Sequence, residues 1–177
     1  MNALAGRRIA KVSGTPGQTR MLNVYLMGAG SGEQGAVTAD SGSLPPAPRS
    51  LYLLDLPGYG YAKASHTDRR AFRLLITHVL DRARLAGVLW LLDIRREPSD
   101  EDRAMQQLFA ERKTPVLAAL TKGDTLARAV RARREGDLRS ALELEEDQMI
   151  VTSARDKEGI DELREAIGGL VRAESPG

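Results

Sequence analysis

Two short polar segments, each placed directly after an apolar run, carry residue types that could bind a nucleotide. They are Asp55–Gly58 and Thr121–Asp124. A carboxylate at Asp124 can accept two hydrogen bonds from the N1–H and the exocyclic amine of guanine, an edge that adenine lacks, and the Lys122 stem can lie along the base plane. A four-residue motif is weak by itself, so a polar turn after a strand stays an equal alternative.

The Asp55–Gly58 segment has the chemistry of a phosphate and metal site. A carboxylate at a strand end can hold a water on Mg²⁺, and Gly58 can bring its N–H close to a γ-phosphate. A plain Pro-Gly turn is the alternative. The Gly58–Tyr61 continuation is unusual for such a turn, and room for a helix–strand–helix–strand block separates the two motifs. A third, weaker segment, Thr152–Ala154, could place backbone N–H groups near guanine O6.

Composition restricts the class of protein. The chain has 177 residues, 42% apolar and 28% charged, which fits one soluble globular domain. It contains no cysteine, which excludes disulfides, thiolate metal sites and thiol catalysis. No apolar run approaches the ~18 residues that span a bilayer. We therefore expect a cytoplasmic protein, a monomer that does not associate with membranes.

The apolar runs predict a mostly parallel α/β sheet with crossover helices. Strands are expected at 22–27 and 51–54, paired around a flexible insertion at 28–50, and then at 87–94, 115–120 and 149–152. The run at 87–94 is typical of a strand covered on both faces. Helices are expected from a cap at Thr67, from a capping box of Ser99 and Asp102, over 126–144 with an interruption at Gly136, and after Ile160.

With Thr15–Thr19 upstream, these motifs resemble those of the EngB family of bacterial ribosome-assembly GTPases. The Asp55–Lys63 string resembles that family's third motif closely, and the similarity runs to about Leu170, broken only by the 28–50 insertion. The resemblance implies a Ras-like, three-layer P-loop GTPase fold forming one domain at 1–174, and a GTP/GDP–Mg²⁺ switch in assembly of the large ribosomal subunit. It implies that residues 2–23 include the end of a first helix and the switch I loop.

The resemblance also assigns site residues. Thr19 would coordinate Mg²⁺ when GTP is bound, and Tyr59 stands where Ras-like enzymes have a water-orienting glutamine, so no catalytic residue is assigned. The implied GTP-binding residues are Gly17, Gln18, Thr19, Arg20, Met21, Asp55, Leu56, Pro57, Gly58, Thr121, Lys122, Gly123, Asp124, Thr152, Ser153 and Ala154.

One departure from the family limits the expected activity. The sequence contains no GxxxxGK[ST] phosphate loop, and nothing in it matches the family's first strand. Because that loop supplies most phosphate contacts, we expect this polypeptide alone not to bind or hydrolyse GTP at useful affinity. The favoured explanation is that Met1 is an internal methionine of a longer GTPase. The alternative is a nucleotide-free ribosome- or protein-binding module that kept the surface of the fold.

Arginines cluster in two stretches that could contact rRNA of the large-subunit precursor. A solvated helix face is an equal alternative, because acidic residues are interspersed. The first stretch is read as one basic helix. The two clusters are Arg69, Arg70, Arg73, Arg82 and Arg84, and Arg128, Arg131, Arg133, Arg134 and Arg139.

Overall fold

The structure is a computed structural model that describes residues 2–6, 8, 23–28, 50–56, 58, 66–82 and 84–174. It divides into two compact units, Met1–Pro57 and Gly58–Gly177, and each is described by itself below. The insertion expected at 28–50 lies, apart from its two end residues, outside the described part of the chain. The single domain expected at 1–174 stays a prediction.

The first unit contains the predicted hairpin. Strand β1 (Asn23–Gly28) pairs antiparallel with β2 (Ser50–Asp55), and the register places Asn23 opposite Asp55 and Gly28 opposite Ser50. The short helix α1 (Asn2–Ala5) lies where the resemblance expects the end of a helix. The pairing of the two strands is therefore confirmed, and it brings Asp55 to the end of the hairpin that is remote from the insertion.

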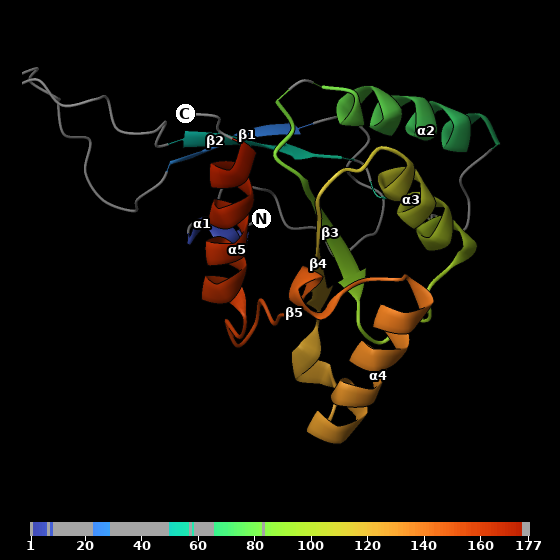
Figure 1. The fold of residues 1–177 in the computed structure, drawn as a ribbon. Coiled ribbons are helices and arrows are strands. Elements are labelled where there is room, and N and C mark those ends of the chain that lie inside the picture. Colours follow the sequence, from blue (N-terminus) through green and yellow to red (C-terminus); the bar gives the residue numbers. More distant parts are fainter. Residues whose placement is uncertain are drawn as a thin grey trace, which may run out of the picture. The chain divides into compact units, whose positions relative to one another are not determined.

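The second unit is built on a parallel sheet of three strands in the order β3–β4–β5. These are β3 (Val88–Asp93), β4 (Val116–Thr121) and β5 (Met149–Val151). Strand β4 lies in the centre, and its residues from Val116 to Leu120 are all buried. In Figure 1 the arrow of β3 points toward the end of the sheet at which α4 lies. The parallel α/β architecture expected from the apolar runs is confirmed for this unit.

Helices α3 (Asp100–Glu111) and α4 (Arg128–Ala141) connect the strands of this sheet, and α2 (His66–Leu80) and α5 (Ile160–Glu174) flank it in the sequence. Helix α2 precedes β3, and α3, α4 and α5 follow β3, β4 and β5. Two 3₁₀ turns, η1 (Gly123–Thr125) and η2 (Glu146–Gln148), complete the element order. Across the described residues, no helix combines the length and the apolar character needed to cross a bilayer.

Helix α3 shows how sequence and packing agree. The Ser99 hydroxyl accepts a hydrogen bond from the Asp102 N–H, and the Asp102 carboxylate accepts one from the Ser99 N–H, so the predicted capping box is confirmed. The apolar face buries Met105, Leu108 and Phe109, and the Phe109 ring meets Trp90 of β3 edge-on at 5.5 Å. The helix is thereby fixed on one face of the sheet.

The prediction that the strand at 87–94 is covered on both faces is wrong at Leu91, which is 56% exposed. The physical reason is that Leu91 points to the face of β3 opposite to the one on which Phe109 of α3 packs against Trp90. Trp90 and Leu92, which point to the opposite face, are buried. An apolar run does not show which face of a strand is covered.

Three helix details also differ from expectation. Helix α2 begins at His66, so Thr67 lies inside the helix and is not its cap, and α2 ends at Leu80, so Arg82 and Arg84 lie beyond it. Helix α4 continues through Gly136 without interruption. The buried Leu138 belongs to the same helix, and its packing outweighs the weak helix propensity of one glycine.

Candidate functional site

The ends of the three parallel strands bring two of the predicted motifs together. Asp93, the last residue of β3, pairs in register with Thr121, the last residue of β4, and Leu120 pairs with Val151 of β5. Because parallel strands end at one edge of a sheet, the segments that follow β4 and β5 share that edge. Those segments are Thr121–Asp124 and Thr152–Ala154.

The turn after β4 is held by hydrogen bonds to both neighbouring strands. The Thr121 hydroxyl donates to the Leu92 carbonyl at 2.9 Å, and the Gly123 N–H donates to the Thr152 carbonyl at 3.0 Å. Between them, Lys122 has the left-handed backbone conformation, with φ 65° and ψ 31°. This conformation is unfavourable for a residue other than glycine, so the flanking bonds must maintain it.

Gly123 is buried and has no room for a side chain. A Cβ atom there would lie 2.8 Å from Cγ1 of Val151 and 3.3 Å from a guanidinium nitrogen of Arg131. Its lack of a side chain therefore lets the turn after β4 approach the end of β5 closely. The residue that follows, Asp124, is thereby presented at the shared edge.

Asp124 is half-buried within η1, and no hydrogen bond or ion pair joins its carboxylate to another residue that the structure describes. Its negative charge is the smallest of the contributions that raise the pKa of Arg95, after those of Asp93. A partly buried carboxylate without a protein donor retains its full capacity to accept hydrogen bonds from a ligand. This arrangement suits the recognition of two adjacent N–H donors.

The loop after β5 is also ordered by its own hydrogen bonds. Thr152 and Ser153 are buried, the Ser153 N–H donates to the Glu158 carbonyl at 3.0 Å, and the Ser153 hydroxyl accepts from the Asp156 N–H at 3.0 Å. The Ser153 N–H is therefore engaged within the loop. Ala154 is exposed, and its backbone N–H has no partner among the described residues, so this N–H of the Thr152–Ala154 segment stays available to a ligand.

Gly159 closes this loop in a conformation that other residues avoid. Its φ is +67°, and a Cβ atom would lie 2.2 Å from the carbonyl oxygen of Val151. The Thr152 N–H donates to the Leu120 carbonyl at 2.8 Å, which continues the pairing of β4 and β5 into the loop. The loop position is thus fixed from both ends.

Sequence reasoning missed Asp93, which connects the ends of β3 and β4. Its carboxylate accepts hydrogen bonds from Arg95 Nε at 2.8 Å, from an Arg95 terminal nitrogen at 2.6 Å, and from Lys122 Nζ at 2.8 Å. The backbone N–H of Arg95 also donates to it, at 3.1 Å. The signal that could have found this residue is an acidic side chain ending a strand beside the strand that ends at Thr121.

These contacts shift the titration of the cluster. The hydrogen bonds from Arg95, aided by Lys122, hold the pKa of the Asp93 carboxyl far below its ordinary value of 3.8, although partial burial acts in the opposite direction. The same contact with Asp93 raises the pKa of Arg95. Asp93 is therefore ionised at neutral pH, and it carries a negative charge between two cations.

The other predicted site residues are not brought to this edge by described contacts. Asp55 is half-buried at the end of β2 in the first unit, Leu56 follows it, and Gly58 is exposed. Pro57 and the segment 17–21, with the predicted Mg²⁺ ligand Thr19, lie outside the described residues. Within the described chain no three histidine, aspartate or glutamate side chains gather into a metal site.

This donor set fits a magnesium ion carried by phosphates better than a metal bound by protein alone. Mg²⁺ at nucleotide sites is bound by one or two protein oxygens together with phosphate oxygens. Asp55 is a hard oxygen donor of the appropriate kind at a strand end. The described residues therefore offer one suitable donor and no complete cage.

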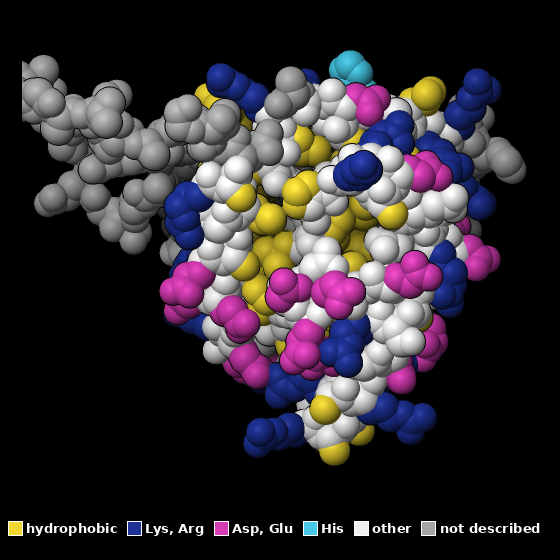
Figure 2. All heavy atoms as spheres, viewed as in Figure 1, with side chains coloured by type: hydrophobic (Ala, Val, Ile, Leu, Met, Phe, Trp, Pro, Cys, Tyr) yellow, Lys and Arg dark blue, Asp and Glu magenta, His cyan; other side chains and the backbone are white. Residues whose placement is uncertain are grey.

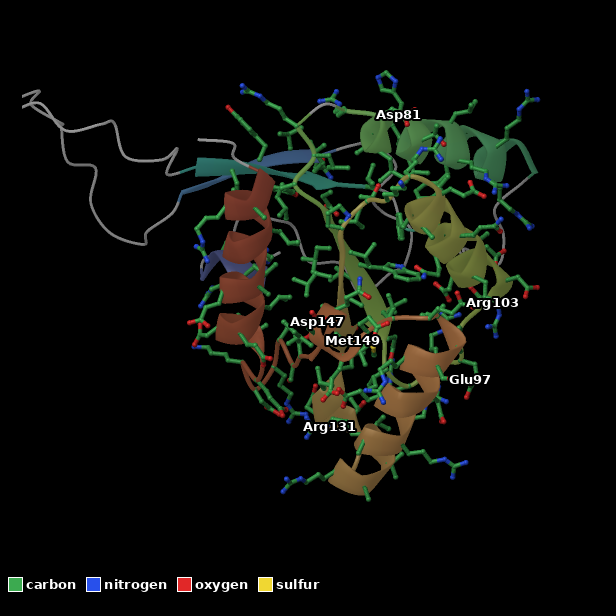
Figure 3. The ribbon with its side chains drawn as sticks, in the orientation of Figure 1. Asp81, Glu97, Arg103, Arg131, Asp147 and Met149 are labelled. Atoms are coloured by element: carbon green, nitrogen blue, oxygen red, sulfur yellow. The ribbon has the colours of Figure 1, made fainter. Side chains whose placement is uncertain are left out.

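A shallow pocket of about 480 Å³ lies beside the turn at Thr121–Asp124, between the start of α4 and the loop after β5. Arg131 of α4, labelled in Figure 3, forms an ion pair with Glu158 at 2.6 Å within it. About one turn further along α4, Arg134 forms an ion pair with Glu97 and donates a hydrogen bond to the Ile94 carbonyl. Both arginines thus connect α4 to loops at the ends of the strands.

Comparison with known proteins agrees with this geometry. The family model described as "50S ribosome-binding GTPase" matches residues 1–122. A "Probable GTP-binding protein EngB" of Syntrophomonas wolfei is 32% identical over 97% of this chain and 79% of the relative. The chain belongs to the EngB family of GTP-binding proteins. An EngB protein of Trichlorobacter lovleyi is 33% identical over 99% of this chain and 80% of the relative.

Solved structures support the EngB-type fold. A crystal structure of a probable GTP-binding protein engB has a TM-score of 0.61 at 18% identity and covers 69% of this chain and 77% of its own. A variant of Aquifex aeolicus Era bound to GDP·AlF₄⁻ has a TM-score of 0.69 at 20% identity and covers 99% of this chain and 52% of its own. The Ras-like GTPase fold predicted from the sequence is confirmed.

Proposed function

We propose that this chain recognises the guanine base of a nucleotide at the shared edge of β4 and β5, as the base-binding part of an EngB-type GTP/GDP switch. The observation that carries the proposal is the half-buried Asp124 carboxylate, which has no described partner and follows a turn fixed by Thr121 and Gly123. It would accept hydrogen bonds from guanine N1–H and the exocyclic amine. The Ala154 N–H would donate to guanine O6.

Two further parts of the proposal concern the phosphates. Asp55 would hold a water on Mg²⁺, Gly58 would serve the γ-phosphate, and Thr19 would be the Mg²⁺ ligand. When bound, Mg²⁺ neutralises charge on the phosphates and orients them. The sequence has no GxxxxGK[ST] loop, so we propose weak phosphate binding and assign no hydrolysis to this chain. A nucleotide-free binding module remains the alternative function.

The base proposal is tested by titrating the ¹⁵N-labelled chain with GMP and with AMP and following the amide signals by NMR. GMP is expected to bind with a dissociation constant of about 1 mM, and AMP at least roughly tenfold more weakly. Shifts should be largest at Ala154 and Asp124. Equal binding of GMP and AMP, or no binding of either, would favour the nucleotide-free module.

We also propose that the chain contacts rRNA of the large ribosomal subunit through the exposed face of α2. Arg70 and Arg73 are exposed there and form no ion pair with another residue that the structure describes, and the neighbouring Leu74 is 64% exposed. In Figure 2 basic side chains predominate over α2, whereas both signs mix over α4. The sequence-based candidates Arg131 and Arg134 are only 22% and 14% exposed and serve ion pairs within the protein.

The surface proposal is tested by sedimentation with purified large subunits. The double variant Arg70→Glu and Arg73→Glu should reduce co-sedimentation at least roughly tenfold, because each phosphate contact contributes to a salt-dependent affinity. Arg133→Glu is the matched control, because Arg133 is exposed on α4. A loss caused equally by the control would show that general charge and not α2 determines binding.

A further inference from the structure

One carboxylate at the end of β3 joins two cations from different elements, and one of them belongs to the proposed base site. Asp93 accepts from Arg95 through both carboxylate oxygens, and its second oxygen also accepts from Lys122 Nζ at 2.8 Å. We propose that Asp93 is a positioning residue of the guanine site, which holds the Lys122 side chain in place for the base. This inference rests on the proposed guanine recognition.

The Lys122 backbone alone does not fix its side chain. The left-handed backbone at Lys122 is set by the bonds of Thr121 and Gly123, but the side chain is 52% exposed and has four rotatable bonds. A flexible lysine stem loses much rotamer freedom when a base packs against it. A stem already held at its ammonium loses less, so the bound state forms at lower entropic cost.

Asp93 is itself well placed to hold that stem. Its side chain is only 16% exposed, and its strand position pairs in register with Thr121, the residue before Lys122. Arg95 engages both carboxylate oxygens in a bidentate pair, which fixes the plane of the carboxylate. The ammonium of Lys122 therefore meets an acceptor whose orientation is also held by Arg95.

The cluster also places charges of alternating sign around the proposed site. Lys122 contacts Asp93, Asp93 contacts Arg95, and the charge of Asp124 contributes weakly to the raised pKa of Arg95. Loss of the Asp93 charge would leave two cations near Asp124 with one counter-charge fewer. Lys122 could then turn toward Asp124 and compete with the guanine N–H donors for its oxygens.

A purely structural role is the competing explanation. The Arg95 N–H also donates a hydrogen bond to the Asp93 carboxylate, and this bond closes a local turn that stabilises the chain after β3. A residue that acts only through this turn would affect binding whether or not Lys122 is present. A residue that acts through Lys122 would lose its effect when the ammonium is removed.

The test is a double-mutant cycle of Asp93→Asn and Lys122→Met, measured as GMP affinity by the NMR titration. Asp93→Asn should weaken GMP binding roughly three- to tenfold, because a part-exposed, charge-assisted contact is lost. In the Lys122→Met background it should change affinity less than about twofold, by the same thermodynamic cycle. Asp81→Asn, which removes the part-exposed ion pair of Asp81 with Arg112, is the matched control and should leave GMP affinity unchanged.

A second measurement keeps folding and binding apart. NMR relaxation of the Lys122 ε-methylene in the ligand-free chain should report a more mobile side chain in Asp93→Asn than in the wild type. The inference is overturned if Asp93→Asn leaves GMP affinity unchanged, or weakens it equally with and without Lys122. Absence of GMP binding by the wild type overturns the proposed function and this inference together, whereas GMP binding that Asp93→Asn does not alter overturns the positioning role alone.

Discussion

The turn at Thr121–Asp124 and the segment at Asp55–Gly58 differ in what holds them. The first is fixed by side-chain and backbone hydrogen bonds to β3 and to the loop after β5, and a buried glycine permits its close approach. The second follows a hairpin whose described contacts are the pairings of β1 and β2. The residues proposed for base recognition thus lie in one packed unit, whereas described contacts of this kind do not fix the residues proposed for phosphate recognition.

This difference indicates that the two halves of a nucleotide site can be separated experimentally. A fixed set of donors and acceptors can recognise a base without the phosphate contacts, although with low affinity. Changes in the turn after β4 and in the loop after β5 should therefore alter base binding and stability together. Changes in the phosphate portion of the ligand matter little for this chain.

The largest expected effect concerns the loop after β5. Gly159→Ala should destabilise the protein by about 3 kcal/mol, because the left-handed backbone is unfavourable for alanine and the new Cβ atom would collide with the Val151 carbonyl. Urea unfolding followed by circular dichroism measures the change. A loss below about 1 kcal/mol would show that the loop relaxes easily and that the base side is not rigid.

The next effect concerns Asp93 and depends on pH. Its folded-state pKa lies below the ordinary value of 3.8, so the carboxylate stabilises the fold above that pH and loses this contribution as the pH falls. Asp93→Asn should therefore lower the free energy of unfolding by about 1 to 2 kcal/mol at pH 7, and this loss should become smaller as the pH drops below about 4.

Urea unfolding of the wild type and Asp93→Asn between pH 7 and pH 3 measures this difference. The charged groups that face this carboxylate are Arg95 and Lys122. A difference that stays constant down to pH 3 would mean that the ion pairs of Asp93 contribute nothing to stability.

A smaller effect of opposite sign is expected on α4. Gly136 lies inside the helix and a Cβ atom there would meet nothing within 4 Å. Gly136→Ala should stabilise the protein by about 0.5 to 1 kcal/mol, because alanine has the higher helix propensity and less freedom in the unfolded chain. A lower urea midpoint of unfolding for Gly136→Ala than for the wild type would contradict a helix that continues through position 136. The variant also serves as a control that should not alter GMP binding.

The smallest expected effect is the difference in affinity between GDP and GMP, which separates the contribution of the phosphates from that of the base. GDP should bind this chain with an affinity within about threefold of GMP, since each additional charged hydrogen bond would otherwise contribute 1.5 to 3 kcal/mol. Isothermal calorimetry or NMR titration in the presence of Mg²⁺ provides the comparison. Micromolar GDP binding would show that phosphate contacts exist outside the described residues.

Much of the fold could be predicted from the sequence, because buried parallel strands and capped helices have local sequence patterns. The apolar runs located β3, β4 and β5, and Ser99 with Asp102 located the start of α3. The exposure of Leu91 could not be predicted, since it depends on which face of the strand is covered. The predicted interruption at Gly136 was wrong because helix propensity depends on the local sequence, whereas the burial of Leu138 depends on tertiary packing.

The site was predictable where its residues are contiguous and hidden where they are not. Thr121–Asp124 is a recognisable string, and the structure places it at a strand end as expected. Asp93 has no such string, because its partner Lys122 lies 29 positions away in the chain and the contact exists only once β3 and β4 pair. Likewise, no pattern shows that the Ser153 N–H is engaged by the Glu158 carbonyl.

The central claim, that Asp124 recognises the guanine base, is tested most directly by Asp124→Asn with GMP and XMP as paired ligands. Xanthine carries a carbonyl where guanine carries its exocyclic amine, so an asparagine amide can donate to xanthine where the aspartate accepted from guanine. The account predicts that the wild type prefers GMP and that Asp124→Asn prefers XMP, each by roughly tenfold. An unchanged preference in the variant would contradict it.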